Sequence, residues 1–378
     1  MQYRRFGKTG IKVSALGFGA MRLPIKSGKS NEKMVDEKLA IAMIRRAIDE
    51  GVNYVDTAYV YHEGHSERVT GLALLDGYRQ KVQLATKSPL WLLEKRADFG
   101  RILDEQLKKL QTDTIDFYLL HAIQQDSWEV VLQYDLLTEM ERAKKAGKIG
   151  HIGFSFHDKL PVFKQIIDHY PHWDFCQIQL NVVNTVYQAG LEGLRYAAAR
   201  DIGVVIMEPL RGGYLANVPP AVRDILAPTG KPAVEWALDF LWDMPEVSLL
   251  ISGMSTMQHV NDNLLYANRS SPGMLSAADQ QVIQRVQEQY KSYQVIPCTG
   301  CDYCLPCPQG VAIPYNFTPY NEYQTLGDLA KSKKAYHDWV TLFGELANKC
   351  TGCQQCESLC PQQIKISQWL PKVHALLG

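Results

Sequence analysis

The 378-residue sequence lacks the features that mark exported, membrane-spanning and polyanion-binding proteins. Neither sign of charge is in excess, because 40 Lys and Arg balance 40 Asp and Glu, so the broad electrostatic field of a nucleic-acid or membrane-surface protein is missing. No stretch reaches the roughly 18 uninterrupted apolar residues of a membrane span, and the opening residues contain no signal-peptide core. We therefore expect a cytoplasmic protein that binds neither nucleic acid nor a membrane.

Cysteine is nearly absent from the first 297 residues. Only Cys176 lies there, in an apolar run where we expect a small buried hydrophobe, and the other eight cysteines follow. A disulfide framework belongs to small secreted domains, which the absence of export features disfavours. The late cysteines therefore predict metal or cluster binding in a reducing compartment.

Between residues 11 and 290, short β-rich apolar runs alternate with longer amphipathic stretches such as 36–50 and 97–110. Eight such runs alternating with helices predict a (β/α)8 TIM barrel. An open dinucleotide-binding sheet is the alternative, but "LGFGAM" has only Gly17 and Gly19 of the three glycines that such a sheet requires. The eight runs lie at 13–21, 52–58, 82–88, 116–122, 151–157, 175–181, 203–209 and 247–253.

Composition changes abruptly near residue 294, where a helical stretch (275–293) gives way to a segment rich in Cys, Pro and Gly. A polar helical pattern returns over 322–349 before the last cysteines. We therefore expect a barrel domain over 1–293 and a small, mainly helical domain over 294–378.

Four residues with reactive side chains follow the ends of neighbouring predicted strands. Asp56 and Tyr61 lie at and just beyond the end of the second run, Lys87 ends the third, and His121 ends the fourth. Parallel strand ends meet at one face of a barrel, so we expect these groups to converge. A lysine ammonium lowers the pKa of a nearby phenol, and a carboxylate holds the ammonium charged, so the group suits proton delivery to an oxygen that gains negative charge. Taken singly, each could be an ordinary ion-pair partner or a structural histidine.

The segments "NYVDTAYVY", "ATKS" and "DFYLLHA", in this order, resemble the aldo/keto reductase family. The resemblance covers about 1–290 and implies the same barrel, with Asp56, Tyr61, Lys87 and His121 as the catalytic tetrad. Tyr59 is the rival phenol, but the family's spacing of five from Asp to Tyr favours Tyr61. The resemblance also implies a nicotinamide cofactor and a small carbonyl or alcohol substrate.

The same resemblance implies where the cofactor binds. Ser155 and Gln177 would hold the nicotinamide carboxamide, "EPLRGG" (208–213) would cover the pyrophosphate, and "SGMSTMQHVNDNL" would hold the adenosine end. The positions that match cofactor contacts are Met21, Ser155, Gln177, Met207, Pro209, Leu210, Gly212, Gly253, Met254, Ser255, His259, Asp262 and Asn263.

Four positions depart from the family pattern. Phe156 stands where an Asn is usual, and Met207 stands where an aromatic often stacks on nicotinamide. Gly253 and His259 replace cationic residues that are familiar from members that prefer NADPH. Family frequency favours NADP(H), with NAD(H) as the alternative. Trp91, after the third run, is either a wall of the substrate pocket or a packing residue.

The late cysteines form two runs, each followed by proline. The second matches the C-x2-C-x2-C-x3-C-P pattern of ferredoxins that bind [4Fe-4S] clusters, whereas structural zinc usually takes separated pairs. In two-cluster ferredoxins the fourth cysteine of each run binds the other cluster, although two rather than three residues separate the last two cysteines of the first run. The pattern predicts two clusters, one on Cys298, Cys301, Cys304 and Cys360 and the other on Cys350, Cys353, Cys356 and Cys307.

These observations lead to an oxidoreductase that interconverts a carbonyl and an alcohol, with clusters that pass single electrons to a redox partner protein. Two alternatives stay open. The chain could be an electron-transfer or redox-sensing protein whose barrel binds nucleotide but turns over slowly. Alternatively, it could be an aldo/keto reductase whose clusters have a purely structural role in the small domain.

Overall fold

The computed structural model describes residues 1–26, 34–293 and 295–378. The chain divides into two compact units. The barrel unit comprises Met1–Pro209 and Ala237–Ser276, and the C-terminal unit comprises Leu210–Trp236 and Ala277–Gly378.

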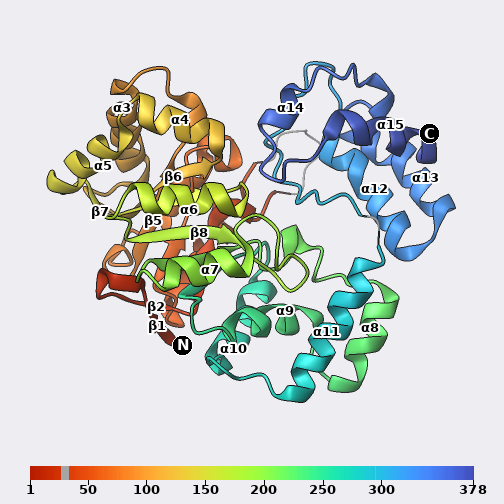
Figure 1. Ribbon diagram of the computed structural model, residues 1–378, viewed down its shortest axis with the longest axis horizontal. Coiled ribbons are helices and arrows are strands. Elements are labelled where there is room, and N and C mark those ends of the chain that lie inside the picture. Colours follow the sequence, from red (N-terminus) through yellow and green to blue (C-terminus); the bar gives the residue numbers. More distant parts are fainter. Residues whose placement is uncertain (27–33, 294) are drawn as a thin grey trace. The chain divides into compact units, whose positions relative to one another are not determined.

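The barrel unit contains a closed barrel in which neighbouring strands run parallel (Figure 1). Around the barrel the strands follow chain order, and the last closes on the first. They are β3 (Leu16–Gly19), β4 (Tyr54–Asp56), β5 (Gln83–Ser88), β6 (Ile115–Ile123), β7 (Ile149–Phe156), β8 (Phe175–Gln179), β9 (Gly203–Met207) and β10 (Leu249–Gly253). The TIM barrel predicted from eight apolar runs is confirmed, and each run overlaps one of these strands.

The barrel strands are buried on both faces because one face lines the barrel and the other packs under helices. Helix α7, for example, packs on β8 and β9. The helices of this unit are α1 (Glu37–Asp49), α2 (His65–Ala73), α3 (Ala97–Leu110), α4 (Gln125–Gln133), α5 (Leu136–Lys145), α6 (Leu160–His169), α7 (Gly190–Ala198) and α10 (Met257–Arg269), with α9 (Ala233–Trp242) continuing into it from the C-terminal unit.

A short antiparallel hairpin of β1 (Tyr3–Arg5) and β2 (Lys12–Ser14), which was not predicted from the sequence, precedes the barrel. Between its strands, Phe6 is fully buried and packs on Tyr54, Phe117 and Phe175. Gly203 opens β9 beneath this ring, and a Cβ there would lie 2.2 Å from Phe6 Cδ2. Glycine is therefore required where the Phe6 ring closes this end of the barrel.

The C-terminal unit is mainly helical, as predicted. Its core is built on Val311, Phe317, Tyr336 and Val373, and six of the late cysteines lie in this core or pack against it. Among the described residues, no helix is both long and apolar enough to span a membrane. The helices are α8 (Pro220–Leu226), α11 (Ala277–Lys291), α12 (Ile313–Leu326), α13 (Leu329–Asp338), α14 (Gln355–Ser358) and α15 (Ile366–Leu377).

Helix α11, which corresponds to the stretch predicted over 275–293, contacts α8 and groups with the C-terminal residues. The domain boundary between residues 293 and 294 therefore stays a prediction from composition.

Candidate active site and cysteine groups

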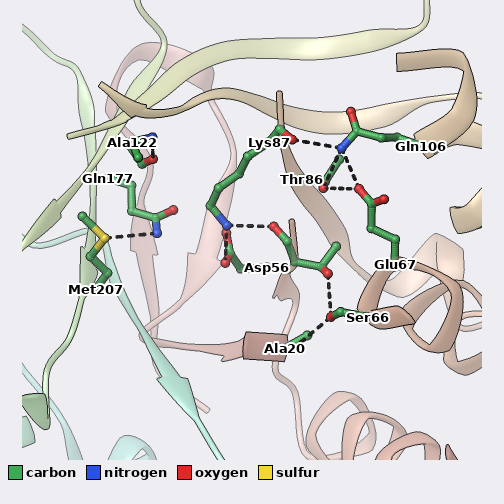
Figure 2. A network of polar contacts seen from close by, with 12 residues as sticks. Ala20, Asp56, Ser66, Glu67, Thr86, Lys87, Gln106, Ala122, Gln177 and Met207 are labelled. Carbon is green, nitrogen blue, oxygen red and sulfur yellow. Dashed lines mark hydrogen bonds and ion pairs between the residues drawn. The ribbon is translucent and has the colours of Figure 1, made fainter. Parts of the chain in front are cut away.

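An ion pair lies at the carboxyl ends of β4 and β5. Lys87 Nζ donates hydrogen bonds to Asp56 Oδ1 at 2.6 Å and to the backbone oxygen of Thr57 at 2.7 Å (Figure 2). Lys87 is fully buried and Asp56 is 1% exposed. The pairing of β4 with β5 brings the two side chains together because both strands end at the same face.

Burial and attraction oppose each other in this pair. Burial lowers the pKa of Lys87 and raises the pKa of Asp56, since each charge loses its hydration, and the attraction between them opposes both shifts. The short charge-assisted hydrogen bond and the additional Thr57 acceptor favour the ionised pair. Lys87 therefore presents an ammonium in a buried site.

The Lys87 ammonium forms a cation–π contact with the Tyr61 ring. Lys87 Nζ lies 4.9 Å from the centre of the Tyr61 ring, and Tyr61 is 8% exposed. The chain turns sharply after Tyr61, because His62, Glu63 and Gly64 all have positive φ, and then enters α2. The rival phenol is engaged elsewhere.

Tyr59 donates its hydroxyl to Glu105 Oε2 at 2.8 Å, and Lys109 lies over its ring. Burial and, next, this hydrogen bond raise the pKa of Tyr59. A raised pKa opposes formation of the phenolate, so the geometry favours Tyr61 as the proton donor.

His121 completes the convergence from β6. Its ring lies 5.9 Å from the Tyr61 ring and 5.1 Å from the Trp91 ring, with the centres as end points. The pairing of β6 with β7 shifts register here, Ala122 has a positive φ, and the Ala122 N–H donates to Ser155 Oγ at 2.7 Å. The structure thus brings together all four residues predicted from the strand ends, with Trp91 beside them.

The pKa of His121 lies well below its usual range, first because of burial and then because of Lys87 and His157. At neutral pH the imidazole is therefore uncharged and retains one N–H donor. An uncharged donor beside an ammonium suits binding of a polar but neutral oxygen.

His157 gives this part of the barrel a measurable pH dependence. It is 8% exposed, and burial lowers its pKa from 6.5 to about 4, against a hydrogen bond with Gln188. The pKa of His157 is lower in the folded than in the unfolded protein, so the unfolded state binds a proton first as the pH falls. The free energy of unfolding is therefore highest above about pH 6.5 and decreases as the pH falls toward 4. At about 1.4 kcal/mol per pH unit, the difference amounts to about 3 kcal/mol.

Between pH 6.5 and pH 4, we therefore expect the unfolding free energy of His157→Gln to fall by about 3 kcal/mol less than that of wild type. Denaturant unfolding at a series of pH values measures this slope. His172→Gln changes an exposed histidine and is the matched control. Equal slopes in wild type and the His157 variant would contradict the assignment.

The predicted carboxamide contacts leave acceptors and donors available. Gln177 Nε2 donates to Met207 Sδ at 3.6 Å, whereas its buried Oε1 has no hydrogen-bond partner among the described residues. The Ser155 hydroxyl accepts from Ala122 and still has its proton to donate. A primary amide could donate to Gln177 and accept from Ser155, so these residues fit a nicotinamide carboxamide.

Phe156, the residue in place of the usual Asn, is fully buried and packs on Phe163 of α6 and on Phe154. Its side chain belongs to the layer between strand and helix. The position therefore contributes packing and no polar group.

The predicted adenosine segment follows β10. Ser255 Oγ donates to the Arg22 backbone oxygen at 2.9 Å, and a Cβ on Gly253 would lie 2.7 Å from Arg22 Cγ. The Ser255 N–H points at His259 Nδ1 at 3.4 Å. The residues that come together here are therefore Gly253, Ser255 and His259, with Arg22 as a neighbour that was not predicted from the sequence.

The remaining predicted cofactor positions divide into buried and exposed groups. Met254 is fully buried, and Asn263 donates to Ser252 Oγ at 3.0 Å, so both shape the segment from within. Asp262 is bonded to Gln258 on the surface of α10, and Met21 is partly exposed in the turn after β3. Pro209 belongs to the barrel unit, whereas Leu210 and Gly212 belong to the C-terminal unit.

All nine cysteines lie in described residues and all are free thiols. Cys176 is buried inside β8, as predicted, and burial raises its pKa. Burial also raises the pKa of Cys304, and the neighbouring thiols of Cys301, Cys298 and Cys360 raise it further. The last cysteine of the second run therefore lies near the first run.

The second set mirrors the first. Burial, against a backbone hydrogen bond and together with Cys307, Glu357 and Cys350, raises the pKa of Cys356 to about 11. Cys307, the last cysteine of the first run, therefore lies near the second run. Cys353 is exposed.

Each run begins with the same Cys-Thr-Gly-Cys turn. The Gly300 N–H donates to Cys298 Sγ at 3.5 Å, and the Gly352 N–H donates to Cys350 Sγ at 3.4 Å. Both glycines have positive φ. Backbone N–H groups aimed at sulfur stabilise a thiolate and tune a cluster that it binds, so these turns fit cluster ligation.

Within the described ranges, no group of three or more His, Cys, Asp or Glu side chains is arranged to hold a metal ion. A single zinc ion needs its sulfur ligands about 2.3 Å from one point, whereas each corner iron of a cubane cluster takes its own thiolate. The two-residue spacing of the cysteines within each run therefore favours a cluster over a single zinc ion.

The polar residues behind Lys87 were not among those predicted from the sequence. Glu67 and Gln106 are fully buried and joined by a hydrogen bond, although they lie on different helices. Glu67 stands in the first turn of α2, where an acidic residue normally faces solvent. The available signal was weak: Gly71 and Leu74, four and seven residues after Glu67, are apolar, but Thr70, three residues after it, is polar.

Comparison with known proteins gives two family matches. The model described as "Aldo/keto reductase family" matches residues 15–279, and that described as "4Fe-4S dicluster domain" matches residues 297–364. The chain is 27% identical to L-galactose dehydrogenase of Arabidopsis thaliana over 316 residues, which cover 76% of this chain and 93% of that protein.

Two solved structures have the same fold. An aldo-keto reductase from Bacillus halodurans in its holo form aligns with a TM-score of 0.61 and 27% identity, covering 76% of this chain and 96% of that one. An aldo/keto reductase from Klebsiella pneumoniae in complex with NADP and acetate aligns with a TM-score of 0.62 and 23% identity, covering 75% and 95%. The second likeness bears on the fold alone.

Proposed function

The chain belongs to the aldo/keto reductase family of oxidoreductases and carries a C-terminal 4Fe-4S dicluster domain, and from this premise we propose that it interconverts a small carbonyl and its alcohol with NADP(H). The observation that carries the proposal is the Lys87 ammonium held between the Asp56 carboxylate and the Tyr61 ring. A bound reduced nicotinamide supplies the hydride. The residues of the chain must then supply a proton and polarise the carbonyl oxygen of the substrate.

Each tetrad residue has one task in this proposal. Tyr61 gives its phenol proton to the carbonyl oxygen, and the adjacent Lys87 ammonium stabilises the phenolate that remains. Asp56 keeps Lys87 charged and oriented, and His121 donates its N–H to the same oxygen. In the reverse direction, the Tyr61 phenolate takes the proton from the alcohol.

The choice of NADP(H) follows family frequency. Ser155 and Gln177 supply the carboxamide contacts described above, whereas Gly253 provides no cation and His259 is a weak substitute for Arg. NAD(H) is therefore the second cofactor to test. Parallel turnover measurements with both cofactors decide between them.

For the cysteines we propose two [4Fe-4S] clusters with crossed ligation, in which Cys360 completes the site of the first run and Cys307 that of the second. A chain with both clusters holds about eight iron atoms. The electrostatic proximity of Cys304 to Cys360 and of Cys356 to Cys307 supports the crossed arrangement.

Paired substitutions test this crossing. We expect Cys304→Ala and Cys360→Ala each to remove or degrade the same cluster, so the double variant should lose no more iron than either single variant. Cys304→Ala combined with Cys356→Ala should affect both clusters. Iron analysis and EPR of the reduced protein provide the measurement, with Cys176→Ala as the control. Uncrossed ligation instead predicts that the Cys304 and Cys360 double variant loses iron from both clusters. The Cys304 and Cys356 double variant affects both clusters under either arrangement and therefore serves as the reference for the loss of two.

Clusters pass single electrons, whereas a hydride carries two. Electron exchange between a nicotinamide and the clusters therefore needs a carrier such as a flavin, and the sequence contains no flavin motif. An anaerobic mixture of reconstituted protein with NADPH or NADH, with and without a carbonyl panel, tests the link through cluster absorbance and EPR. Carbonyl turnover with unchanged clusters supports the proposed reaction. Cluster reduction without carbonyl turnover would favour the electron-transfer alternative.

A further inference from the structure

A buried carboxylate lies behind the strand that carries Lys87. Glu67, in α2, is fully buried, and its Oε1 accepts hydrogen bonds from Thr86 Oγ1 at 2.7 Å and Gln106 Nε2 at 2.6 Å (Figure 2). Its Oε2 lies 3.5 Å from Lys109 Nζ. Thr86 immediately precedes Lys87 in β5.

Gln106 extends this contact to the backbone of Lys87. Its Nε2 also donates to the Lys87 carbonyl oxygen at 3.0 Å, and its Oε1 accepts from the Tyr118 hydroxyl at 2.6 Å. The Gln106 side chain is therefore fixed at both ends. Through it, Glu67 constrains the strand at Lys87 itself.

The preceding residue of α2 supports Lys87 from the other side. The Ser66 hydroxyl lies 2.8 Å from Thr57 Oγ1 and donates to the Ala20 carbonyl oxygen at 3.0 Å. The Thr57 carbonyl oxygen in turn accepts from Lys87 Nζ. The first turn of α2, which begins four residues after Tyr61, thus holds both the backbone and the ammonium of Lys87.

A carboxylate is a costly way to join a strand to two helices. Burying a charge costs free energy that a neutral amide avoids, and burial indeed raises the pKa of Glu67 against its hydrogen bonds. A negative charge does, however, act on Lys87, whose pKa Glu67 raises as a smaller contribution after that of Asp56. The charge and the hydrogen bonds therefore have separable effects.

We propose that Glu67 is a positioning residue for Lys87: it fixes β5 through Thr86 and Gln106 and supplies a second negative charge that keeps the ammonium protonated when Tyr61 gives up its proton. The role in turnover rests on the proposed function, whereas the effect on Lys87 ionisation does not. The charged and titratable groups around this pair are Asp56 on β4, Tyr61 after β4, Lys109 on α3, and Tyr118 and His121 on β6.

Two substitutions separate charge from geometry. Glu67→Gln keeps the length and an acceptor oxygen but removes the charge, so we expect Lys87 to lose its proton roughly half to one pH unit lower than in wild type. The alkaline limb of the kcat profile should move down by the same amount, with KM for the cofactor unchanged. Glu67→Asp keeps the charge and shortens the side chain, so kcat should fall several-fold without movement of that limb.

Ionisation of Lys87 can be read without turnover by a 15N side-chain titration of the full-length protein, with the signal assigned by Lys87→Arg. Glu105→Gln removes a carboxylate next to Gln106 in sequence and is the matched control, which should leave both readouts unchanged. Lys109→Met removes a cation beside Glu67 and should move the Lys87 midpoint upward, which provides a second reading should Glu67→Gln not fold.

An unchanged Lys87 midpoint in Glu67→Gln, or equal shifts in the Gln and Asp variants, would overturn the inference. If the wild-type protein reduces no carbonyl while the midpoint still moves, the proposed reaction fails and the effect of Glu67 on Lys87 stands.

Discussion

Changing Tyr61 to Phe is expected to lower kcat for carbonyl reduction by about 10²- to 10⁴-fold, because it removes the proton donor and leaves the ring in place. The Lys87 ammonium, which lies 4.9 Å from the ring centre, then has no phenolate to stabilise. Cofactor affinity should not change, since the substitution deletes one hydroxyl. Single-turnover kinetics and quenching of protein fluorescence by NADPH measure the two quantities separately.

Tyr59→Phe is the matched control for this result. Its hydroxyl donates to Glu105 at 2.8 Å, so its loss should leave kcat within a few-fold of wild type. Near-wild-type turnover by the Tyr61 variant, or a large loss in the Tyr59 variant, would show that the wrong phenol has been assigned.

Changing Lys87 to Met should destabilise the barrel by about 3–5 kcal/mol at neutral pH, because it leaves the Asp56 carboxylate buried without its cation. The loss should also depend on pH. Burial already raises the pKa of Asp56, and Lys87 opposes that rise, so removal of Lys87 raises it further above the unfolded value of about 3.9. A raised folded pKa contributes stability that is complete below the unfolded value and lost as pH rises.

The destabilisation of Lys87→Met should therefore be smallest near pH 4 and grow toward the folded pKa of Asp56. Adding Asp56→Asn removes the titrating group, so the double variant should recover part of the stability at neutral pH and lose the slope. Denaturant unfolding from pH 4 to 8 measures both effects. A pH-independent loss shared by the single and double variants would mean that Asp56 is not the source.

The barrel could be predicted from sequence because each strand is a short apolar run buried on both faces, and such runs leave a strong pattern. The hairpin could not, because β1 and β2 contain three residues each and show no usable period. Asp56, Lys87 and His121 could be placed because residues at the ends of neighbouring parallel strands must converge.

Glu67 could not be placed in this way, because its burial depends on Thr86 and Gln106, which are 19 and 39 residues away in sequence. Local pattern assigns an acidic residue in a first helical turn to solvent. The position of Glu67 behind the tetrad can therefore be recognised only from the tertiary contacts.

Because the Phe6 ring closes one end of the barrel, substitutions at the two ends should have different effects. Phe6 packs on residues at or near the beginnings of strands, such as Phe175, whereas Asp56 and Lys87 stand at strand ends. Substitutions at the closed end should change how much protein accumulates in a cell without altering the rate per molecule, because they lie away from the tetrad. Substitutions in the buried ion pair at the open end should change both quantities, because Lys87 and Asp56 are also buried.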